Sequence, residues 1–208
     1  PGLTYLDADD PRTGAIHRLV EHALVELDGG VLWVDARNVA TTYRFTDGPV
    51  QHRALSTIEV ARAFTAYQHH TLVHEAVDRL DDRHALVVAP CLGSLYADDD
   101  VPVAEAERLF DDVLDALDRL ADERAVTVLV TTATAPFAER VASRAAHTVS
   151  VTQTDLGVAF ETDAFQTTVY HGPGYWQTTI PYWIELFGRI DPMAEPTFDP
   201  HPSLAGLG

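Results

Sequence analysis

The fold of this chain is decided by residues 84–132, which read HALVVAPCLGSLYADDDVPVAEAERLFDDVLDALDRLADERAVTVLVTT. The stretch opens and closes with the apolar runs ALVVA (85–89) and TVLVT (127–131), which are typical of strands buried on both faces of a parallel sheet. Between them, four apolar residues share one face of a predicted helix: Leu109, Val113, Leu117 and Leu120. The order strand, helix, strand predicts an α/β fold with a mostly parallel twisted sheet flanked by helices.

The same alternation continues on both sides of this stretch. We expect helices at about 14–28, 56–80, 102–123 and 136–144, and strands at 30–35, 84–89, 125–131, 147–153 and 156–162. The last two strands flank Asp-Leu-Gly at 155–157, which predicts the turn of a terminal β-hairpin. We therefore expect one core over residues 1–163, followed by an extension at 164–208.

The charge of the chain restricts the surfaces it can contact. Asp and Glu outnumber Arg 32 to 14, lysine is absent, and the net charge is −18. Nucleic acids and anionic membranes would repel such a surface, so we expect it to bind neither directly. The composition resembles that of proteins from halophilic archaea, in which molar salt screens the repulsion. An ordinary acidic protein of a mesophile is the alternative.

Cysteine content and hydropathy indicate the compartment. The single cysteine, Cys91, cannot form an intramolecular disulfide and suits a reducing environment. No apolar stretch approaches the ~20 residues of a membrane-spanning helix. We expect a soluble, cytoplasmic protein. Because the only methionine is Met193, we also expect residues to precede Pro1.

One segment carries a resemblance to a known family. IEVARAFTAYQHHTLVHEA (58–76) resembles the part of archaeal RadA-type recombinases that follows the second core strand, where a V-A-R-A-F box, here 60–64, leads into a helix. Residues 84–96 look like the Walker B strand of that family. The pairs and runs ER (107–108), LDRLA (117–121) and VTVLVTT (126–132) follow in the order and spacing of the family. The resemblance covers about residues 2–163 and implies a RecA-type P-loop ATPase core.

The resemblance places DADDPRTG (7–14) where the phosphate-binding loop GxxxxGK[ST] should stand. Such loops use a lysine to reach the β and γ phosphates and a Ser or Thr to hold magnesium. Here Thr13 stands for the lysine and Gly14 for the hydroxyl residue, in a stretch that also contains Asp7 and Arg12. Asp7 and its acidic neighbours would repel a triphosphate.

Three further positions implied by the resemblance have also changed. Arg37 stands for the glutamate that polarises water, Pro90 for the magnesium-facing Walker B aspartate, and Ala133 for the phosphate-sensing glutamine. The DNA-binding loops of the family correspond to 97–102 and 133–137, which contain no Arg. We expect a pseudo-ATPase without a cofactor and without intrinsic DNA affinity.

The extension is rich in aromatic residues. Seven of the eighteen aromatics of the chain fall within residues 164–190, where we expect a strap with a short helix at 182–188 before a flexible end at 201–208. The strap can pack on its own core, or it can face a protein partner, since Trp and Tyr are common anchors of interfaces. The candidate partner-binding residues are Arg62, Tyr175, Trp176, Tyr182 and Trp183. Arg62 has an alternative role as the ion-pair partner of an acid.

Histidines form a cluster at His69, His70 and His74. The i, i+4 spacing of His70 and His74 can hold zinc, but no carboxylate motif plainly completes a site. We therefore expect polar surface histidines and no metal.

These observations predict a catalytically inactive RecA/RadA-like protein. It would be an accessory or regulatory partner in DNA recombination, repair or maintenance, and would bind a RadA-type recombinase or a replication or repair protein. Two alternatives remain open. One is an enzyme of altered chemistry that uses an atypical nucleotide site or the histidine cluster. The other is a structural protein that self-assembles.

Overall fold

The computed structural model describes residues 2–12, 14–27, 29–41, 43–46, 55–132, 135–154, 157–162, 166–172 and 175–178. Within these residues, no helix combines the length and the apolar character that crossing a membrane requires.

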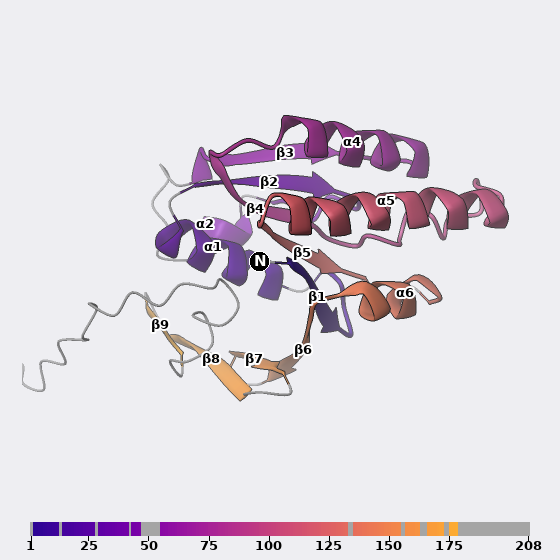
Figure 1. Ribbon diagram of the computed structural model, residues 1–208. Helices are drawn as coiled ribbons and strands as arrows, with labels where there is room; N and C mark the ends of the chain where they lie inside the picture. Colours follow the sequence, from indigo (N-terminus) through magenta and orange to yellow (C-terminus); the bar gives the residue numbers. More distant parts are fainter. Residues whose placement is uncertain are drawn as a thin grey trace, which may run out of the picture.

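A nine-stranded sheet in the order β3-β2-β4-β5-β1-β6-β7-β8-β9 forms the centre of the fold (Figure 1). Its strands are β1 (Gly2–Ala8), β2 (Gly30–Asp35), β3 (Ile58–Arg62), β4 (His84–Ala89), β5 (Thr127–Thr131), β6 (His147–Thr154), β7 (Gly157–Glu161), β8 (Gln166–Gly172) and β9 (Tyr175–Thr178). The strands from β3 to β6 pair in parallel, and β7, β8 and β9 continue the sheet in antiparallel pairs.

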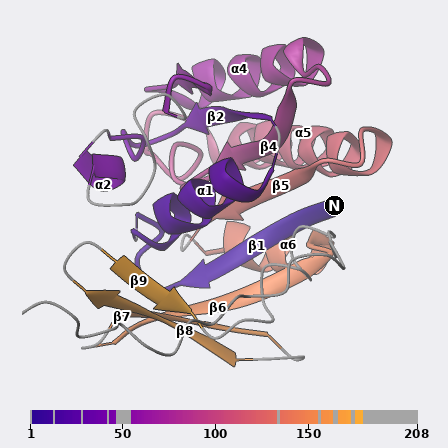
Figure 2. The ribbon, with the colours of Figure 1, turned by 90° about the vertical axis from the view of Figure 1, so that its left-hand side faces the viewer.

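Helices cover both faces of the parallel part of the sheet. They are α1 (Ala15–Glu26), α2 (Tyr43–Thr46), α4 (Ala66–Arg79), α5 (Val103–Glu123) and α6 (Phe137–Arg144). Figure 2 shows α1 in front of the sheet, with α4, α5 and α6 behind it. This arrangement agrees with right-handed crossovers, because the chain moves along the sheet in one direction through α1 and in the other through α4, α5 and α6.

The amphipathic pattern of α5 is confirmed. Leu109, Val113, Leu117 and Leu120 are all buried, whereas Asp111, Asp112 and Asp122 are exposed. The apolar runs of β2, β4 and β5 are also buried, apart from the half-buried Ala85, as expected for strands covered on both faces.

Most of the expected elements are confirmed. The strands at 30–35 and 84–89 have the expected bounds, and the hairpin of β6 and β7 is present, although residues 155–156 of its turn lie outside the described residues. The central strand β1 was not among the elements that the sequence pattern indicated. The helix expected at 56–80 is wrong in its first part, because residues 58–62 form β3 and the helix starts only at Ala66.

The tertiary context explains this error. Ile58 to Arg62 pair in parallel with β2, and the amide of Ala63 donates to the carbonyl oxygen of Asp35 at 2.9 Å. Thr65 then caps α4, since its side chain accepts a hydrogen bond from the Gln68 amide at 3.2 Å. The cap fixes the boundary between strand and helix.

The sheet continues past residue 163, where we expected the core to end. β8 pairs with β7, and β9 pairs with β8, so Tyr175 and Trp176 belong to the last strand of the sheet. Tyr182, Trp183, the helix expected at 182–188 and the end at 201–208 lie outside the described residues.

Candidate functional site

The candidate site lies at the carboxyl ends of the parallel strands. β1 and β5 are neighbours, but the chain leaves β1 toward α1 on one face and leaves β5 toward α6 on the other. In open α/β sheets such a switch point is where ligands bind. The loops after β1, β2 and β4 meet at this edge.

Thr131, the last residue of β5, ties two of these loops together. Its hydroxyl donates to the carbonyl oxygen of Pro11 at 2.8 Å and accepts from the amide of Cys91 at 2.9 Å. Its carbonyl oxygen accepts from the amide of Leu92 at 2.8 Å. The loops that follow β1 and β4 are therefore fixed to one residue of β5.

The stretch 7–14 connects β1 to α1. The side chains of Asp7, Asp9 and Asp10 are exposed, and Asp10 accepts a hydrogen bond from the backbone amide of Arg12 at 2.9 Å. Gly14 is the N-cap of α1 and offers no side-chain cap; a Cβ there would lie 3.2 Å from the guanidinium of Arg44. Thr13 lies outside the described residues.

Tyr5 in β1 contacts the start of this stretch through its hydroxyl. Its hydroxyl lies 2.9 Å from the carbonyl oxygen of Thr132 and 3.2 Å from Asp7 Oδ1. Burial, with the Asp7 charge second, raises the pKa of Tyr5 to about 12, so the phenol stays protonated and acts as the donor.

Arg37 is held by the loop after β4. Its Nε donates to Ser94 Oγ at 3.1 Å, and its Nη2 donates to Ser94 O at 2.7 Å and to Asp98 Oδ1 at 2.6 Å. A guanidinium in this ion pair cannot accept a proton from water.

The described residues at this edge do not supply the groups that hold a magnesium nucleotide in P-loop ATPases. Pro90, directly after β4, has no side-chain oxygen with which to coordinate magnesium. Gly14 has none either, and the three exposed aspartates around 7–10 would face the phosphates. Ala133, which the resemblance places at the phosphate-sensing glutamine, lies outside the described residues.

Arg62 contacts an acid inside the molecule. The buried carboxylate of Asp35 accepts from Arg62 Nε at 3.1 Å and from the amides of Val39 and Ala40 at 2.8 and 3.1 Å. Arg62 Nη2 also donates to the carbonyl oxygen of Ala40 at 3.0 Å. Of the two roles that the sequence allowed for Arg62, the structure shows the ion pair.

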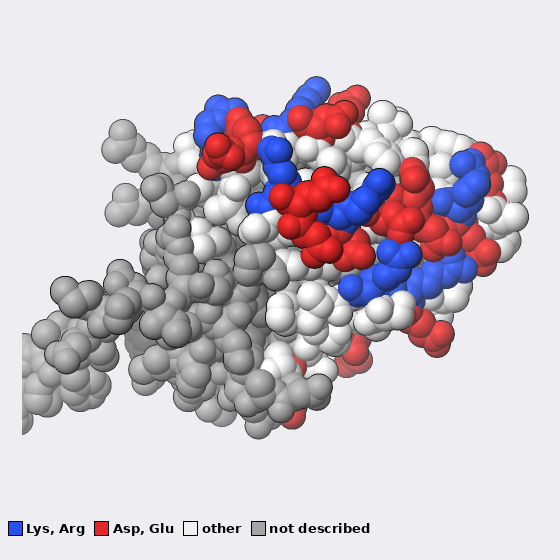
Figure 3. All heavy atoms as spheres, viewed as in Figure 1, with Lys and Arg blue, Asp and Glu red and all other residues white. Residues whose placement is uncertain are grey.

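The exposed face beside Arg62 is apolar. β3 is the edge strand of the sheet, and Val60, Phe64 and Tyr67 are large apolar residues with 46%, 72% and 47% of their surface exposed. Phe64 and Tyr67 line a shallow hollow with four neighbours: Arg62, Gln68, Thr71 and Leu72. On the side of the molecule shown in Figure 3, arginines and acidic residues are interspersed.

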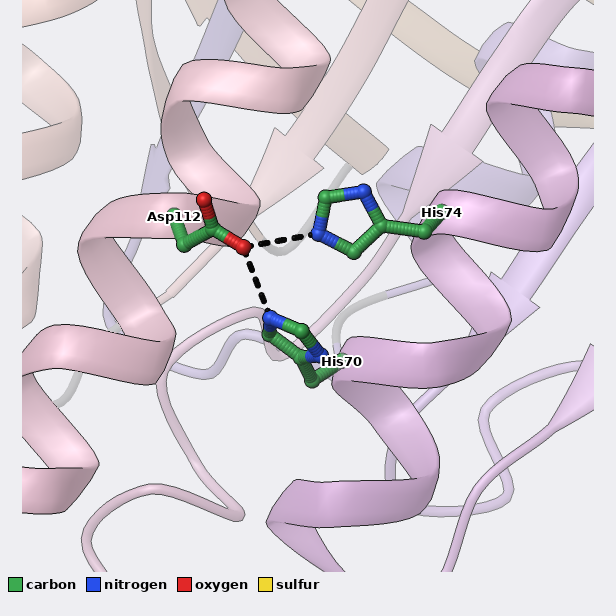
Figure 4. Close-up of side chains that lie close together, drawn as sticks. All are labelled: His70, His74 and Asp112. Atoms are coloured by element: carbon green, nitrogen blue, oxygen red, sulfur yellow. Dashed lines mark hydrogen bonds and ion pairs between the residues drawn. The ribbon is translucent and has the colours of Figure 1, made fainter.

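The histidine cluster divides into two parts. His69 is buried, its Nδ1 lies 2.8 Å from Tyr96 Oη, and burial lowers its pKa to about 4. His70 and His74 point toward Asp112 of α5 (Figure 4). Sequence reasoning missed Asp112 because it belongs to the acidic face of an amphipathic helix, where no spacing rule distinguishes it from its neighbours.

The chain was compared with known proteins. The model of the Rad51 family matches residues 25–156, which is more than half of the 208 residues. The match includes the V-A-R-A-F box and Pro90 but begins after the stretch 7–14. No curated protein matches the chain.

Proposed function

Since this chain belongs to the Rad51 family, we propose that it is a RecA-like, recombination-related protein that no longer hydrolyses ATP and acts by binding another protein. The observation that carries the proposal is the Arg37–Asp98 ion pair of 2.6 Å at the edge where the family resemblance places the catalytic glutamate. The guanidinium fixed there has the opposite charge to the carboxylate that would activate water.

The other changes support the loss of activity. The chain has no lysine to reach the phosphates, and Pro90 stands where magnesium needs a carboxylate. For hydrolysis to persist, other groups would have to take over the roles of the missing lysine and of the missing carboxylate.

Binding of a protein partner is supported by the edge of the sheet. Phe64 exposes 72% of its surface next to β3, the edge strand of the described sheet, and an aromatic residue in such a place is a typical interface anchor. Family membership favours a RadA-type recombinase, or a replication or repair protein, as the partner. The aromatic residues of 164–190 are a second candidate surface.

The composition supports a setting for this function. A charge of −18 without any lysine suits the cytoplasm of a halophilic archaeon, in which molar salt shortens the Debye length to ~3 Å. The loop at 97–102 carries Asp98, Asp99 and Asp100 and no Arg, so we propose that the protein does not bind DNA directly. A band shift of single-stranded DNA at moderate salt would contradict this.

Nucleotide binding is tested by titrating the full chain with ATP and magnesium in molar KCl, beside an active recombinase of the family. We expect saturation only for the active recombinase. Saturable binding of ATP by this chain at micromolar concentration would contradict the loss of the nucleotide site.

Partner binding is tested by capture from native extract in molar salt, using the tagged full chain and two variants. Phe64→Ser removes the anchor at β3, and the double variant Trp176→Ala/Trp183→Ala removes aromatics of the extension. Val103→Ser is the matched control, because Val103 is exposed to a similar extent, 75%, at the start of α5.

We expect the unmodified chain and the control to capture the same recombinase or repair protein, and Phe64→Ser to lose it. Loss only in the tryptophan variant would move the interface to the extension. Equal capture by all variants would exclude both surfaces, and recovery of the bait alone would favour self-assembly.

A further inference from the structure

The contact between α4 and α5 contains a cluster of metal-ligating groups. His70 Nε2 and His74 Nε2 lie 2.7 and 2.9 Å from the same atom, Asp112 Oδ2 (Figure 4). The three ligand atoms all lie within 4.8 Å of one another, and the two imidazole rings are 4.6 Å apart between centroids. Three side chains thus converge on one point from two packed helices.

The backbone places these groups without distortion. His70 and His74 are one turn apart on α4, so their rings project from the same face of the helix. The buried residues His69 and Val73, next to these histidines along the helix, anchor α4 in the core. On α5, Val113 and Leu109 anchor the helix and leave Asp112 at the seam.

The arginines of this region do not compete for Asp112. Arg140 Nη1 pairs with Asp111 at 2.9 Å, and Arg144 Nη1 pairs with Asp115 at 2.6 Å. In the described part of the chain, the ion pairs of Asp112 involve only the two histidines. Its carboxylate therefore lies between two imidazoles rather than beside a guanidinium.

The hydrogen bonds are compatible with replacement by a metal ion. A carboxylate only accepts, so each imidazole must place its proton on Nε2 to hold the present contacts. A zinc ion would bind the two Nε2 atoms at about 2.0–2.2 Å, and the proton of each neutral ring would then move from Nε2 to Nδ1. Tetrahedral bonds of that length separate neighbouring ligand atoms by about 3.3 Å, so each histidine nitrogen needs to move away from Asp112 Oδ2 by only about half an ångström.

We propose that His70, His74 and Asp112 bind one zinc ion that ties α4 to α5. Two imidazole nitrogens and one carboxylate oxygen suit zinc, whereas magnesium and calcium prefer oxygen ligands alone. The three side chains are 26%, 38% and 50% exposed, so a water molecule has room to complete the tetrahedron. Bound there, the ion would fix α4, and with it the Tyr67 surface, relative to the core.

Zinc binding is tested on the metal-free full chain in molar KCl near neutral pH, by competition with a chromophoric zinc chelator. The variants His70→Gln, His74→Gln and Asp112→Asn each remove one ligand. His147→Gln and Asp122→Asn are matched controls, because both residues are exposed and neither belongs to the three clustered ligands. We expect one zinc per unmodified chain, and a loss of affinity of about tenfold or more in each ligand variant but not in the controls.

A second measurement separates this site from other histidines of the chain. Cobalt(II) should give the strong visible absorption of tetrahedral coordination in the unmodified chain and the controls, and lose it in Asp112→Asn. Zinc should also raise the unfolding temperature of the unmodified chain but not of Asp112→Asn, because only the folded state assembles the three ligands. Absence of zinc uptake, or equal affinity in Asp112→Asn and the controls, would overturn the proposal.

Discussion

Asp35 holds together the end of β2, the loop after it and the end of β3. Its buried carboxylate accepts hydrogen bonds from two backbone amides and from Arg62. We predict that Asp35→Ala lowers the free energy of unfolding by about 3 kcal/mol, because it leaves three donors without their acceptor. Chemical denaturation measures the change. Asp122→Ala, an exposed change on α5, should stay within about 0.5 kcal/mol of the unmodified chain.

His69 makes the stability of the protein sensitive to acid. Burial lowers its pKa to about 4 in the folded state, whereas an unfolded chain has an ordinary histidine pKa of about 6.5. Between these values the unfolded state binds more protons, so stability falls as the pH falls from 6.5 toward 4. At pH 5 the loss due to His69 is about 2 kcal/mol.

The variant His69→Phe keeps a buried ring but cannot titrate. We predict that it loses about 1 kcal/mol at pH 8, where the contact with Tyr96 is missing, and less additional stability than the unmodified chain between pH 8 and pH 5. His17 and His22, whose pKa values burial also lowers to about 4, should keep the remaining acid sensitivity. An unchanged acid dependence in the variant would contradict the role of His69.

Single residues also mark the limit of what the sequence could predict about the site. Arg37 and Pro90 were identified from the resemblance to the recombinase family, and both lie within two residues of the end of a strand. Asp98, the ion-pair partner of Arg37, lies 61 residues away along the chain. Asp112, which contacts His70 and His74, lies 42 and 38 residues from them. Only the packing of elements brings such groups together.

At the scale of elements, the strands and helices with strong apolar patterns were predictable and those with weak patterns were not. β2, β4 and α5 have continuous runs or a clear helical stripe. β3 carries Glu59, Ala61 and Arg62, which favour helices in isolation, and only pairing with β2 makes it a strand. The helix propensity of these residues is therefore outweighed by the hydrogen bonds of β3 to β2.

The start of α4 provides a test at this scale. Thr65 is the N-cap, and we predict that Thr65→Ala lowers the free energy of unfolding by about 1 kcal/mol, because the Gln68 amide loses its acceptor. Thr71→Ala is the control in the same helix, where Thr71 Oγ1 only donates to the carbonyl oxygen of Tyr67. Because alanine favours helices, this control should cost almost nothing. Thermal or chemical unfolding of both variants measures the difference, and equal stability of the two variants would contradict the role of Thr65 as the N-cap.

At the scale of the whole molecule, the excess of negative charge should make folding depend on salt. We predict that the unfolding temperature rises between 0.1 and 3 M KCl, because added ions screen repulsion among the carboxylates. The double variant Asp99→Asn/Asp100→Asn removes two exposed charges and should show a smaller rise. Equal salt dependence in both proteins would mean that repulsion around this loop does not contribute.

Cys91, the only thiol of the chain, lies at the junction where Thr131 joins the loops after β1 and β4. Its side chain is buried, and burial raises its pKa to about 11, so almost no reactive thiolate faces solvent in the closed molecule. A maleimide can therefore reach it only when this junction separates. The rate at which maleimide alkylates Cys91 therefore reports how often the loops after β1 and β4 separate locally. The thiol is an intrinsic probe of local unfolding at this edge of the sheet.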